Sequence, residues 1–363
     1  MAWIAISSGA GHHFSPAGLG PRGVAPARPM ASMALLARGS LVIETRLPTT
    51  RTPRPLVFFD RAGPRPFHLS LQAIPGGGLS LVLGCGEDIL HRAVNPSGAG
   101  RTDLLRITYS WDAERGFGRL ALERSDRDKV LLSPVGNPQP LRLADLRALL
   151  SDDPARYVAP DVLYLALSDE IEPVGPMPSL MPDTPVATPA GYRRVGDIRR
   201  GDLVLTPDGD AVPVLHRLSR RVPACGSFAP VRLRAPYFGL RQDITVAPSQ
   251  RLVLSGSDVE YMFSQEAVLV EARHLVGGFA ALAASAGPTI TYTQLLLPEH
   301  EALDAAGCVA ETLFVGRLRR QKDLLQASIL NRLDRHGLPE HPQPVHPVLR
   351  AFEAMILAES RAA

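Results

Sequence analysis

Hydrophobic and polar residues alternate along much of the first half of the chain, which is the pattern of strands that bury one face. Leu69, Leu71 and Ala73 alternate with polar residues, a glycine-rich turn follows at 75–78, and the alternation resumes across 79–83. Two such segments joined by a short turn predict a β-hairpin with one apolar face.

The same pattern recurs later in this half. Residues 105–111 place large apolar side chains on one side, and a return segment through Leu120 and Leu122 follows a loop that contains two glycines. Antiparallel strands joined by short turns predict a β-sandwich-like region over residues 39–170. Further elements are expected at 41–45, 56–59 and 162–167 as strands, and at 143–150 as a short helix.

The segment RITYSWDAERGFGRLALE at 106–123 resembles strands of laminin-G and concanavalin-like jelly rolls. That resemblance implies binding of sugars or calcium through loop carboxylates, for which Asp112 and Glu114 are the candidates. An acidic hairpin loop that is merely solvated would give the same sequence, so both interpretations stay open.

The remaining segments have a different character. Residues 1–38 are rich in Gly, Pro, Ala and Ser without periodicity, which predicts a flexible leader. The proline-rich stretch 171–178 predicts a linker. Apolar residues recur at helical spacing from Leu318 to Leu333, so we expect a packed helix within a helical tail at 317–363.

Composition is that of an ordinary globular protein with room for two domains. The 363 residues are 45% hydrophobic and 21% charged, and the net charge of +3 is dispersed along the chain. Nothing in this charge pattern favours a nucleic-acid partner, so none is expected. Nearly all positive charge is arginine, which suggests a GC-rich bacterial genome.

Neither export by a cleavable signal nor a membrane span is predicted. The start, MAWIAISSGAGHHFSP, lacks a basic segment followed by a long apolar one. No apolar run reaches the roughly 18 residues that a membrane span needs. We expect a protein that is cytoplasmic, or exported without a cleavable signal peptide, and that has no membrane partner.

The cysteines and histidines predict no metal, no cofactor and no disulfide framework. Cys85, Cys225 and Cys308 are widely spaced, odd in number and outside any C-x-x-C pair. Cys308, within AAGCVA, is expected to be a small buried residue. Three histidines at 336–346 lie in and beside a proline-rich segment, which we interpret as a surface loop.

The most specific motif is DTPVATPAGYRRVGDIRRGDLVLTPDG at 183–209. Val186 and Thr188 alternate before a turn, and the apolar run 203–206 precedes Pro-Asp-Gly, so two short strands are expected. The motif resembles the opening of Hint (hedgehog/intein) domains of the bacterial type, which reads G-T-x-V-x-T-P-x-G and then V-x-D-L-x-x-G-D-x-V-x-T.

The resemblance implies a Hint domain at 179–316 with self-processing chemistry or its relic. The expected fold is therefore mainly β: an N-terminal β-sandwich-like region followed by a Hint β-fold and a C-terminal helix. The interval between Gly209 and Asp243 is too short for a nested homing endonuclease.

The resemblance also implies which residue would attack. Self-cleaving Hint domains begin with a nucleophile that attacks the preceding carbonyl carbon, and Ser179 stands where the family usually has cysteine. A serine hydroxyl has a much higher pKa than a thiol and needs stronger activation by a base. The bond to be attacked joins Pro178 to Ser179, and the proline ring restricts distortion of the backbone.

The second requirement of the family is the histidine of a T-x-x-H motif, which donates a proton to the scissile amide nitrogen. In DITVAPSQRLVL, the frame of Val246, Pro248 and Arg251 resembles V-S-P-Q-H-R and puts Gln250 in the place of that histidine. A glutamine amide forms hydrogen bonds but does not exchange a proton near neutral pH. Loss of a positioned general acid or base lowers a rate by about two to four orders of magnitude.

Three further residues are candidates for polar support of this chemistry. Asp243 precedes the same strand, and His274 lies in ARHLV, a segment similar to one in the family. His274 would either substitute for the missing histidine or cap a structural turn. His300 matches the histidine of the closing strands, which read roughly Y-x-L-x-x-x-x-H-x-x-x-x-x-G.

The residues at the end of the Hint-like region, before Thr312, predict that complete splicing does not occur. Inteins end in His-Asn, where the asparagine side chain cyclises to release the C-terminal segment. Ala310 and Glu311 hold that place before Thr312, so the succinimide route has no asparagine.

Two functions of different classes follow. The first is intein-like autoprocessing by an N-terminal acyl shift at Ser179, slow or inactive, with at most a single turnover on the protein's own chain. The second is a catalytically degenerate Hint scaffold, with a binding role for a glycan or protein through the N-terminal sandwich.

Overall fold

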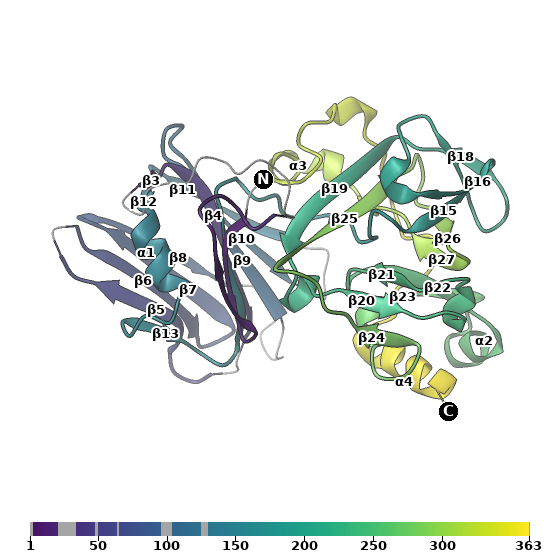
Figure 1. The fold of residues 1–363 in the computed structure, drawn as a ribbon, viewed down its shortest axis with the longest axis horizontal. Coiled ribbons are helices and arrows are strands. Elements are labelled where there is room, and N and C mark those ends of the chain that lie inside the picture. The colour runs from purple at the N-terminus through teal and green to yellow at the C-terminus, as the bar shows by residue number, and fades with distance from the viewer. Residues whose placement is uncertain are drawn as a thin grey trace. The chain divides into compact units, whose positions relative to one another are not determined.

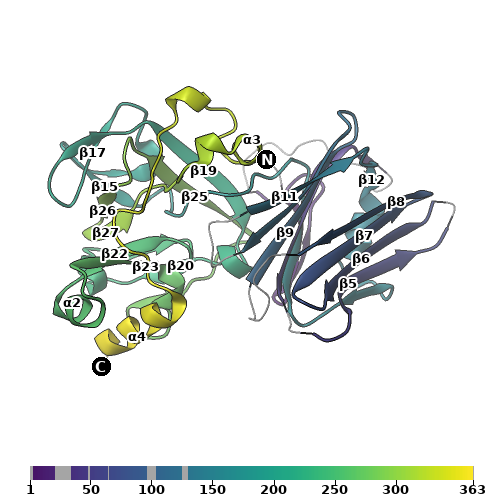
Figure 2. The ribbon, with the colours of Figure 1, turned by 180° about the vertical axis from the view of Figure 1, so that it is seen from behind.

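The computed structural model describes residues 3–20, 34–47, 50–63, 65–95, 104–124 and 130–362. The chain divides into two compact units, Met1–Gly175 and Pro176–Ala363, called here the N-terminal and C-terminal units (Figures 1 and 2). The boundary falls inside the stretch 171–178 that was expected to be a linker. Strands dominate both units, and a helix ends the chain, which confirms the predicted fold class.

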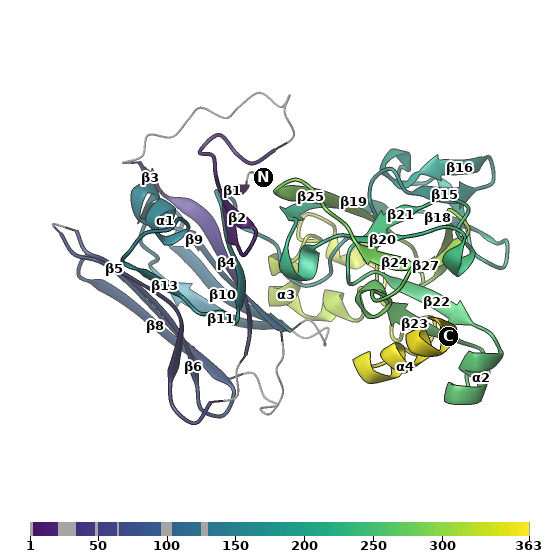
Figure 3. The same cartoon turned by 60° about the horizontal axis from the view of Figure 1, so that its bottom comes forward.

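The N-terminal unit is built from two antiparallel sheets (Figure 3). Among the described residues, the larger sheet has the strand order β11-β10-β9-β4-β14-β1-β2 and the smaller the order β13-β5-β6-β7-β8. The larger sheet contains β1 (Trp3–Ser8), β2 (Gly11–Phe14), β4 (Arg38–Arg46), β9 (Leu104–Asp112), β10 (Phe117–Arg124), β11 (Val130–Gly136) and β14 (Val162–Ser168). The smaller sheet contains β5 (Arg54–Arg61), β6 (Phe67–Ile74), β7 (Gly78–Cys85), β8 (Asp88–Val94) and β13 (Arg156–Val158). Outside them lie β3 (Leu35–Leu36), β12 (Leu141–Arg142) and α1 (Leu143–Leu149).

The alternating apolar residues of the sequence form the core of this sandwich. Leu71 pairs with Leu81 across β6 and β7, and Tyr109 pairs with Leu120 across β9 and β10, so both predicted hairpins are confirmed. These four side chains belong to one buried core. Successive residues of a strand point to opposite faces, so the alternating apolar residues of these two hairpins lie together on the inner faces of the sheets.

The predicted leader over 1–38 is wrong for residues 3–14 and 35–38. Strand β1 pairs with β14, where Ala5 lies opposite Leu167, and Ile4 is fully buried. The segment WIAIS is short and apolar on both faces, so it shows no periodicity, and its pairing partner lies far away in the sequence. Residues 21–33 of the expected leader lie outside the described residues.

The C-terminal unit is a β-fold with short helices at its edges. Its described residues form a sheet of order β16-β15-β26-β27-β22-β23, a sheet of order β21-β20-β24, and the pairs β17-β18 and β19-β25. The strands are β15 (Pro185–Thr188), β16 (Gly191–Arg194), β17 (Leu203–Leu205), β18 (Ala211–Pro213), β19 (His216–Pro223), β20 (Val231–Leu233), β21 (Ile244–Val246), β22 (Arg251–Ser255), β23 (Ala267–Glu271), β24 (Ala281–Ala283), β25 (Thr289–Leu296), β26 (Ala302–Ala305) and β27 (Cys308–Glu311). The helices are α2 (Ser257–Phe263), α3 (Lys322–Ala327) and α4 (Ala351–Ala362), with 3-10 turns at η1 (Val195–Asp197), η2 (Gly226–Phe228), η3 (Tyr237–Gly239), η4 (Ala272–His274), η5 (Leu318–Arg320) and η6 (Arg335–Gly337).

The Hint-like motif folds as its sequence predicts. Val186 pairs with Arg193 across the β15–β16 hairpin, and Val204 of β17 pairs with Val212 of β18. Val186 also pairs with Ala305 of β26, which joins the start of this unit to its closing strands. The opening and closing segments are thus neighbours in one sheet.

The predicted helix from Leu318 to Leu333 is shorter than expected. Helix α3 ends at Ala327, because the Ser328 hydroxyl donates to Leu325 O and accepts from Leu330 N, which replaces helical hydrogen bonds. Leu318 and Leu325 still pack in a common apolar cluster. The helix that ends the chain is the separate α4.

Candidate functional site

Ser179 is fixed by backbone hydrogen bonds on both sides. Its carbonyl oxygen accepts from Ala247 N at 2.7 Å. The next residue, Leu180, exchanges two hydrogen bonds with Thr293 of β25, from Leu180 N at 3.1 Å and to Leu180 O at 2.7 Å. Only 5% of the Ser179 surface is exposed, so its hydroxyl lies in a dry, rigid place.

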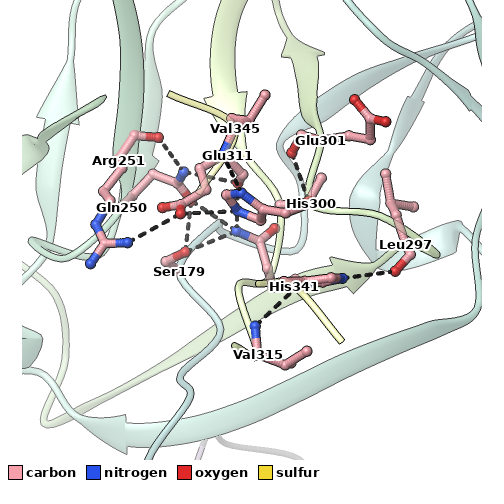
Figure 4. Close-up of polar contacts among 12 residues, drawn as sticks. Ser179, Gln250, Arg251, Leu297, His300, Glu301, Glu311, Val315, His341 and Val345 are labelled. Carbon is pink, nitrogen blue, oxygen red and sulfur yellow. Dashed lines mark hydrogen bonds and ion pairs between the residues drawn. The ribbon is translucent and has the colours of Figure 1, made fainter. Parts of the chain in front are cut away.

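The hydroxyl of Ser179 is held between two glutamine side chains (Figure 4). Its Oγ donates to Oε1 of Gln250 at 2.6 Å and accepts from Nε2 of Gln294 at 3.0 Å. The sequence prediction that Ser179 and Gln250 lie together is met by this contact. We call Ser179, Gln250 and Gln294 the amide cluster.

Gln294 was not foreseen as a site residue. It lies on β25 with 2% of its surface exposed, and its Nε2 is 3.0 Å from Oε1 of Gln250 and 3.0 Å from the carbonyl oxygen of Glu311. The signal in the sequence was a lone amide at the start of the apolar run QLLL, because a polar residue inside such a strand needs a buried partner.

Both ends of the Gln250 side-chain amide form hydrogen bonds. Its Nε2 donates to the carbonyl oxygens of Arg251 at 2.7 Å and Glu311 at 3.1 Å. Carbonyl oxygens only accept, so the nitrogen must face them and the oxygen must face Ser179. Gln250 therefore orients the Ser179 proton but has no capacity to remove it.

A second group of side chains next to the amide cluster does carry ionisable groups. Glu311 Oε1 lies 3.0 Å from His300 Nε2 and 3.2 Å from an Arg251 guanidinium nitrogen. Arg251 Nε lies 3.9 Å from Glu271, which is 2.6 Å from Arg273 Nε and 3.6 Å from His274 Nε2. We call these six residues, together with His341, the ionisable cluster.

The two clusters meet at Glu311 on different atoms. Its backbone oxygen accepts from Gln250 and Gln294, whereas its carboxylate faces His300 and Arg251 (Figure 4). Nδ1 of His300 accepts from Val345 N at 2.9 Å, which assigns the ring proton to Nε2, facing Glu311. His300 is thus turned toward a carboxylate and not toward Ser179.

The pKa values within the ionisable cluster reflect burial and neighbouring charge. Burial tends to raise the pKa of Glu271, but a hydrogen bond from His274 and the charges of Arg273 and Arg251 outweigh it and lower that pKa. Glu271 is therefore ionised at neutral pH, and His274 serves as one of its partners. That contact agrees with the structural interpretation of His274.

His341 corrects the prediction of a surface loop of histidines. Only 1% of its surface is exposed, Nδ1 accepts from Val315 N at 3.3 Å, and Nε2 donates to Leu297 O at 3.3 Å. Its ring centroid is 5.5 Å from that of His300. Burial and the charge of His300 lower the pKa of His341 to about 4, so the buried ring is neutral.

Asp243 has structural contacts away from both clusters. Its carboxylate accepts from Arg232 Nε at 2.8 Å and Ala235 N at 2.9 Å. These hydrogen bonds, first from Ala235 and then from Arg232, lower the pKa of Asp243 and tie the ends of β20 and β21 together. The structure records no contact between the described atoms of Asp243 and those of the amide cluster.

Cys308 is buried, as its sequence context predicts, and the candidate Asp112 has a structural contact. Cys308 is 1% exposed, and burial raises the pKa of its thiol to about 12, which keeps it protonated. Asp112 accepts from Arg115 N at 3.1 Å and so closes the β9–β10 turn.

Among the described residues, no three His, Cys, Asp or Glu side chains gather in a way that would hold a metal ion. Over the same ranges, no helix is long and apolar enough to cross a membrane.

Comparisons with known proteins give one family match, which lies within the C-terminal unit. Residues 178–317 match the family model described as "Hint domain". The gp41-1 intein is similar in structure at 15% identity, with 37% of this chain and 98% of that chain covered and a TM-score of 0.24. The Msm DnaB1 intein splicing domain, solved with zinc, is 19% identical over 37% of this chain and 98% of its own, with a TM-score of 0.26.

Another similar structure covers a larger share of the chain. The CBM40 of the Ruminococcus gnavus IT-sialidase is 15% identical over 47% of this chain and 91% of its own, with a TM-score of 0.26. No curated protein sequence matches the chain significantly.

Proposed function

We propose that the C-terminal unit, in which residues 178–317 match the Hint-domain family model, is an intein-like module whose self-processing is reduced to a slow acyl shift at the Pro178–Ser179 bond. The position of the Ser179 hydroxyl at the start of the domain supports this proposal. The chain is both the catalyst and the substrate, so each molecule reacts once at most.

The reaction is an isomerisation that needs no other reactant. Ser179 Oγ attacks the carbonyl carbon of Pro178, the bond from that carbon to Ser179 N breaks, and the hydroxyl proton ends on the nitrogen. The product is an ester of Pro178 on Ser179 Oγ with a free amine. Water or hydroxylamine then cleaves the ester and separates residues 1–178 from 179–363.

The amide cluster is the observation that carries the proposal of a slow reaction. Ser179 Oγ donates to a neutral amide oxygen at 2.6 Å, which has no useful basicity. A positioned acid or base contributes about two to four orders of magnitude to such reactions. Without one, Ser179 keeps its proton, and the ester forms rarely.

Release of the C-terminal segment is not part of the proposal. Glu311 offers no side-chain amide nitrogen for succinimide formation, and its carboxylate is held by His300 and Arg251. The domain therefore lacks the step that would complete splicing.

The test is intact mass spectrometry of the purified full chain, with and without hydroxylamine, for wild type and Ser179→Ala. We expect slow, hydroxylamine-dependent fragments split between Pro178 and Ser179 in the wild type alone. Uncleaved protein in every sample, or the same fragments from Ser179→Ala, would end the proposal of an acyl shift.

A second function, of another class, is favoured by the same neutral cluster. If Ser179 never reacts, the C-terminal unit is a scaffold and the chain acts by binding through the N-terminal sandwich. A full-length Ser179→Ala protein that keeps wild-type binding to a glycan or protein ligand supports this function. Binding that requires Ser179, or that is absent from the wild type, contradicts it.

A further inference from the structure

The outer face of the five-stranded sheet in the N-terminal unit combines exposed aromatic rings with polar groups. Strand register sets its members in rows that run across the strands. One row reads Tyr157, Phe58, Ser70, Val82 and His91; a second reads Asp60, His68, Gly84 and Ile89; a third includes Gln72, Ser80 and Ala93. We call these residues the outer face.

The aromatic side chains of the outer face are exposed, whereas most large apolar side chains of this sheet are buried in the core. Tyr157 and Phe58 are direct cross-strand partners on β13 and β5, yet they are 43% and 37% exposed. Their neighbours Val57 and Phe59 point inward and are buried in the core. We call these two adjacent exposed side chains the aromatic platform, since exposed aromatic residues of this kind are common at binding surfaces.

The ring of Phe58 is held in place by a polar neighbour. His68 packs edge-on against it with 5.4 Å between ring centroids, and His68 Nδ1 lies 3.3 Å from Oδ1 of Asp60. The platform is therefore preorganised, and hydrogen-bonding groups lie at its edge. Preorganised contacts lose less entropy when a ligand binds.

The polar groups continue across the other strands. Ser80 Oγ lies 3.0 Å from His91 Nε2, and Gln72 Nε2 donates to Ser70 Oγ at 3.1 Å. Hydroxyl, imidazole and amide groups each accept and donate, so they match ligands that carry hydroxyl groups. Ser70 is buried at 4% exposure and serves to orient Gln72, whereas Gln72, Ser80 and His91 are at least partly exposed and keep further lone pairs and protons for a ligand.

The second row carries no side chain between His68 and Ile89, because Gly84, which is buried, stands between them. Gly84 occupies that place in the register, and a Cβ built there would lie 3.4 Å from His68 Cβ, an ordinary contact. Packing therefore does not require glycine at this position. Its effect is a low point in the outer face, flanked by larger side chains.

We propose that the outer face binds a neutral oligosaccharide, with a sugar ring stacked on Phe58 and Tyr157. A pyranose presents an apolar C–H face to such a platform and hydroxyl groups around its rim to polar side chains. Five strands about 4.8 Å apart span about 19 Å, which suits several sugar units in a row.

Charge selects among saccharides. Asp60 is the one Asp, Glu, Lys or Arg side chain of the outer face as defined above from the described residues. Its carboxylate disfavours an anionic sugar and accepts hydrogen bonds from a neutral one. This proposal rests on the binding role that we proposed as the second function, and it names the site and ligand class for that role.

The test uses the full chain on an array of neutral oligosaccharides and their sialylated counterparts, followed by calorimetry with the strongest neutral binder. Wild type is compared with the double variant Phe58→Ala/Tyr157→Ala. Phe117→Ala is the matched control, because Phe117 is an aromatic residue of the other sheet that is 41% exposed. We expect the double variant to bind about tenfold more weakly and the control to bind as the wild type does.

A second variant tests the shape of the outer face. Gly84→Val fills the low point beside His68 and is expected to weaken binding while thermal unfolding confirms a folded protein. Binding that survives both changes leaves the binding role standing but overturns its placement on the outer face. A preference for sialylated glycans overturns the ligand class. A wild type that binds no glycan overturns the oligosaccharide proposal and leaves only a protein ligand for the second function.

Discussion

The two polar clusters of the C-terminal unit touch the same residue and have opposite chemistry. The amide cluster holds the Ser179 hydroxyl between neutral groups and reaches Glu311 through its backbone oxygen. The ionisable cluster holds charges and histidines and reaches Glu311 through its carboxylate. The groups that could move a proton are thus separated from Ser179, which supports our proposal that this domain holds the serine hydroxyl in place without activating it.

The difference also predicts how each cluster responds to pH. The amide cluster has no group that titrates between pH 4 and 9, so its contribution to stability is constant over that range. The ionisable cluster contains Glu271 and His341, and folding lowers the pKa of each.

The largest effect on stability is expected from Gln294→Ala. The change leaves Ser179 Oγ, Gln250 Oε1 and Glu311 O without this donor and leaves a cavity. Together these losses lower the free energy of unfolding by about 3–5 kcal/mol. Urea unfolding at pH 5 and pH 8 should give the same loss.

The control for this experiment is Gln265→Ala, which removes an exposed glutamine of the same unit. Its effect should stay within about 0.5 kcal/mol. A loss for Gln294→Ala that changes strongly with pH would show that the amide cluster is not neutral.

A smaller, pH-dependent effect on the free energy of unfolding is expected at His341. Its folded pKa of about 4 lies below the ordinary value of 6.5, so the unfolded chain takes up the proton first. The stability that neutral His341 contributes is present above pH 6.5 and is lost as the pH falls to about 4. The difference of about 2.5 pH units corresponds to about 3 kcal/mol.

The measurement compares the slope of unfolding free energy against pH between 6.5 and 4 for wild type, His341→Gln and the exposed-site control His336→Gln. We expect a flatter slope for His341→Gln alone. Equal slopes in all three proteins would contradict a neutral, buried His341.

The smallest effect is expected at Asp243, which lies outside both clusters. Asp243→Asn keeps a side chain that accepts from Ala235 N but loses the charge that pairs with Arg232. The yield of hydroxylamine-dependent fragments should equal that of wild type. A fragment yield as low as that of Ser179→Ala would contradict this expectation and show that Asp243 takes part in the reaction.

Much of the fold was predictable because the alternation of residues such as Leu69, Leu71 and Tyr109 is a local signal. Strand β1 was not, since its apolar residues show no period and its partner is β14. The buried state of His341 was not predictable either, because it depends on Leu297 and Val315.

Some residues of the candidate site could likewise be predicted from the sequence, and others could not. Motif order predicted that Ser179 and Gln250 would meet, and the structure places them in direct contact. Gln294 was missed because its role arises only when β25 lies beside the opening segment. Asp243 is close to Gln250 in the sequence, which made it a candidate for the site, but its side chain pairs with Arg232 and Ala235.

The most direct test of the separation between nucleophile and base is a time course of intact mass for Ser179→Cys and for Ser179→Cys/Gln250→His. The account predicts that the histidine accelerates cleavage between residues 178 and 179 by about two to four orders of magnitude over the cysteine alone. Equal rates in the two proteins would contradict it, because the neutral amide at position 250 would then not be what limits the reaction.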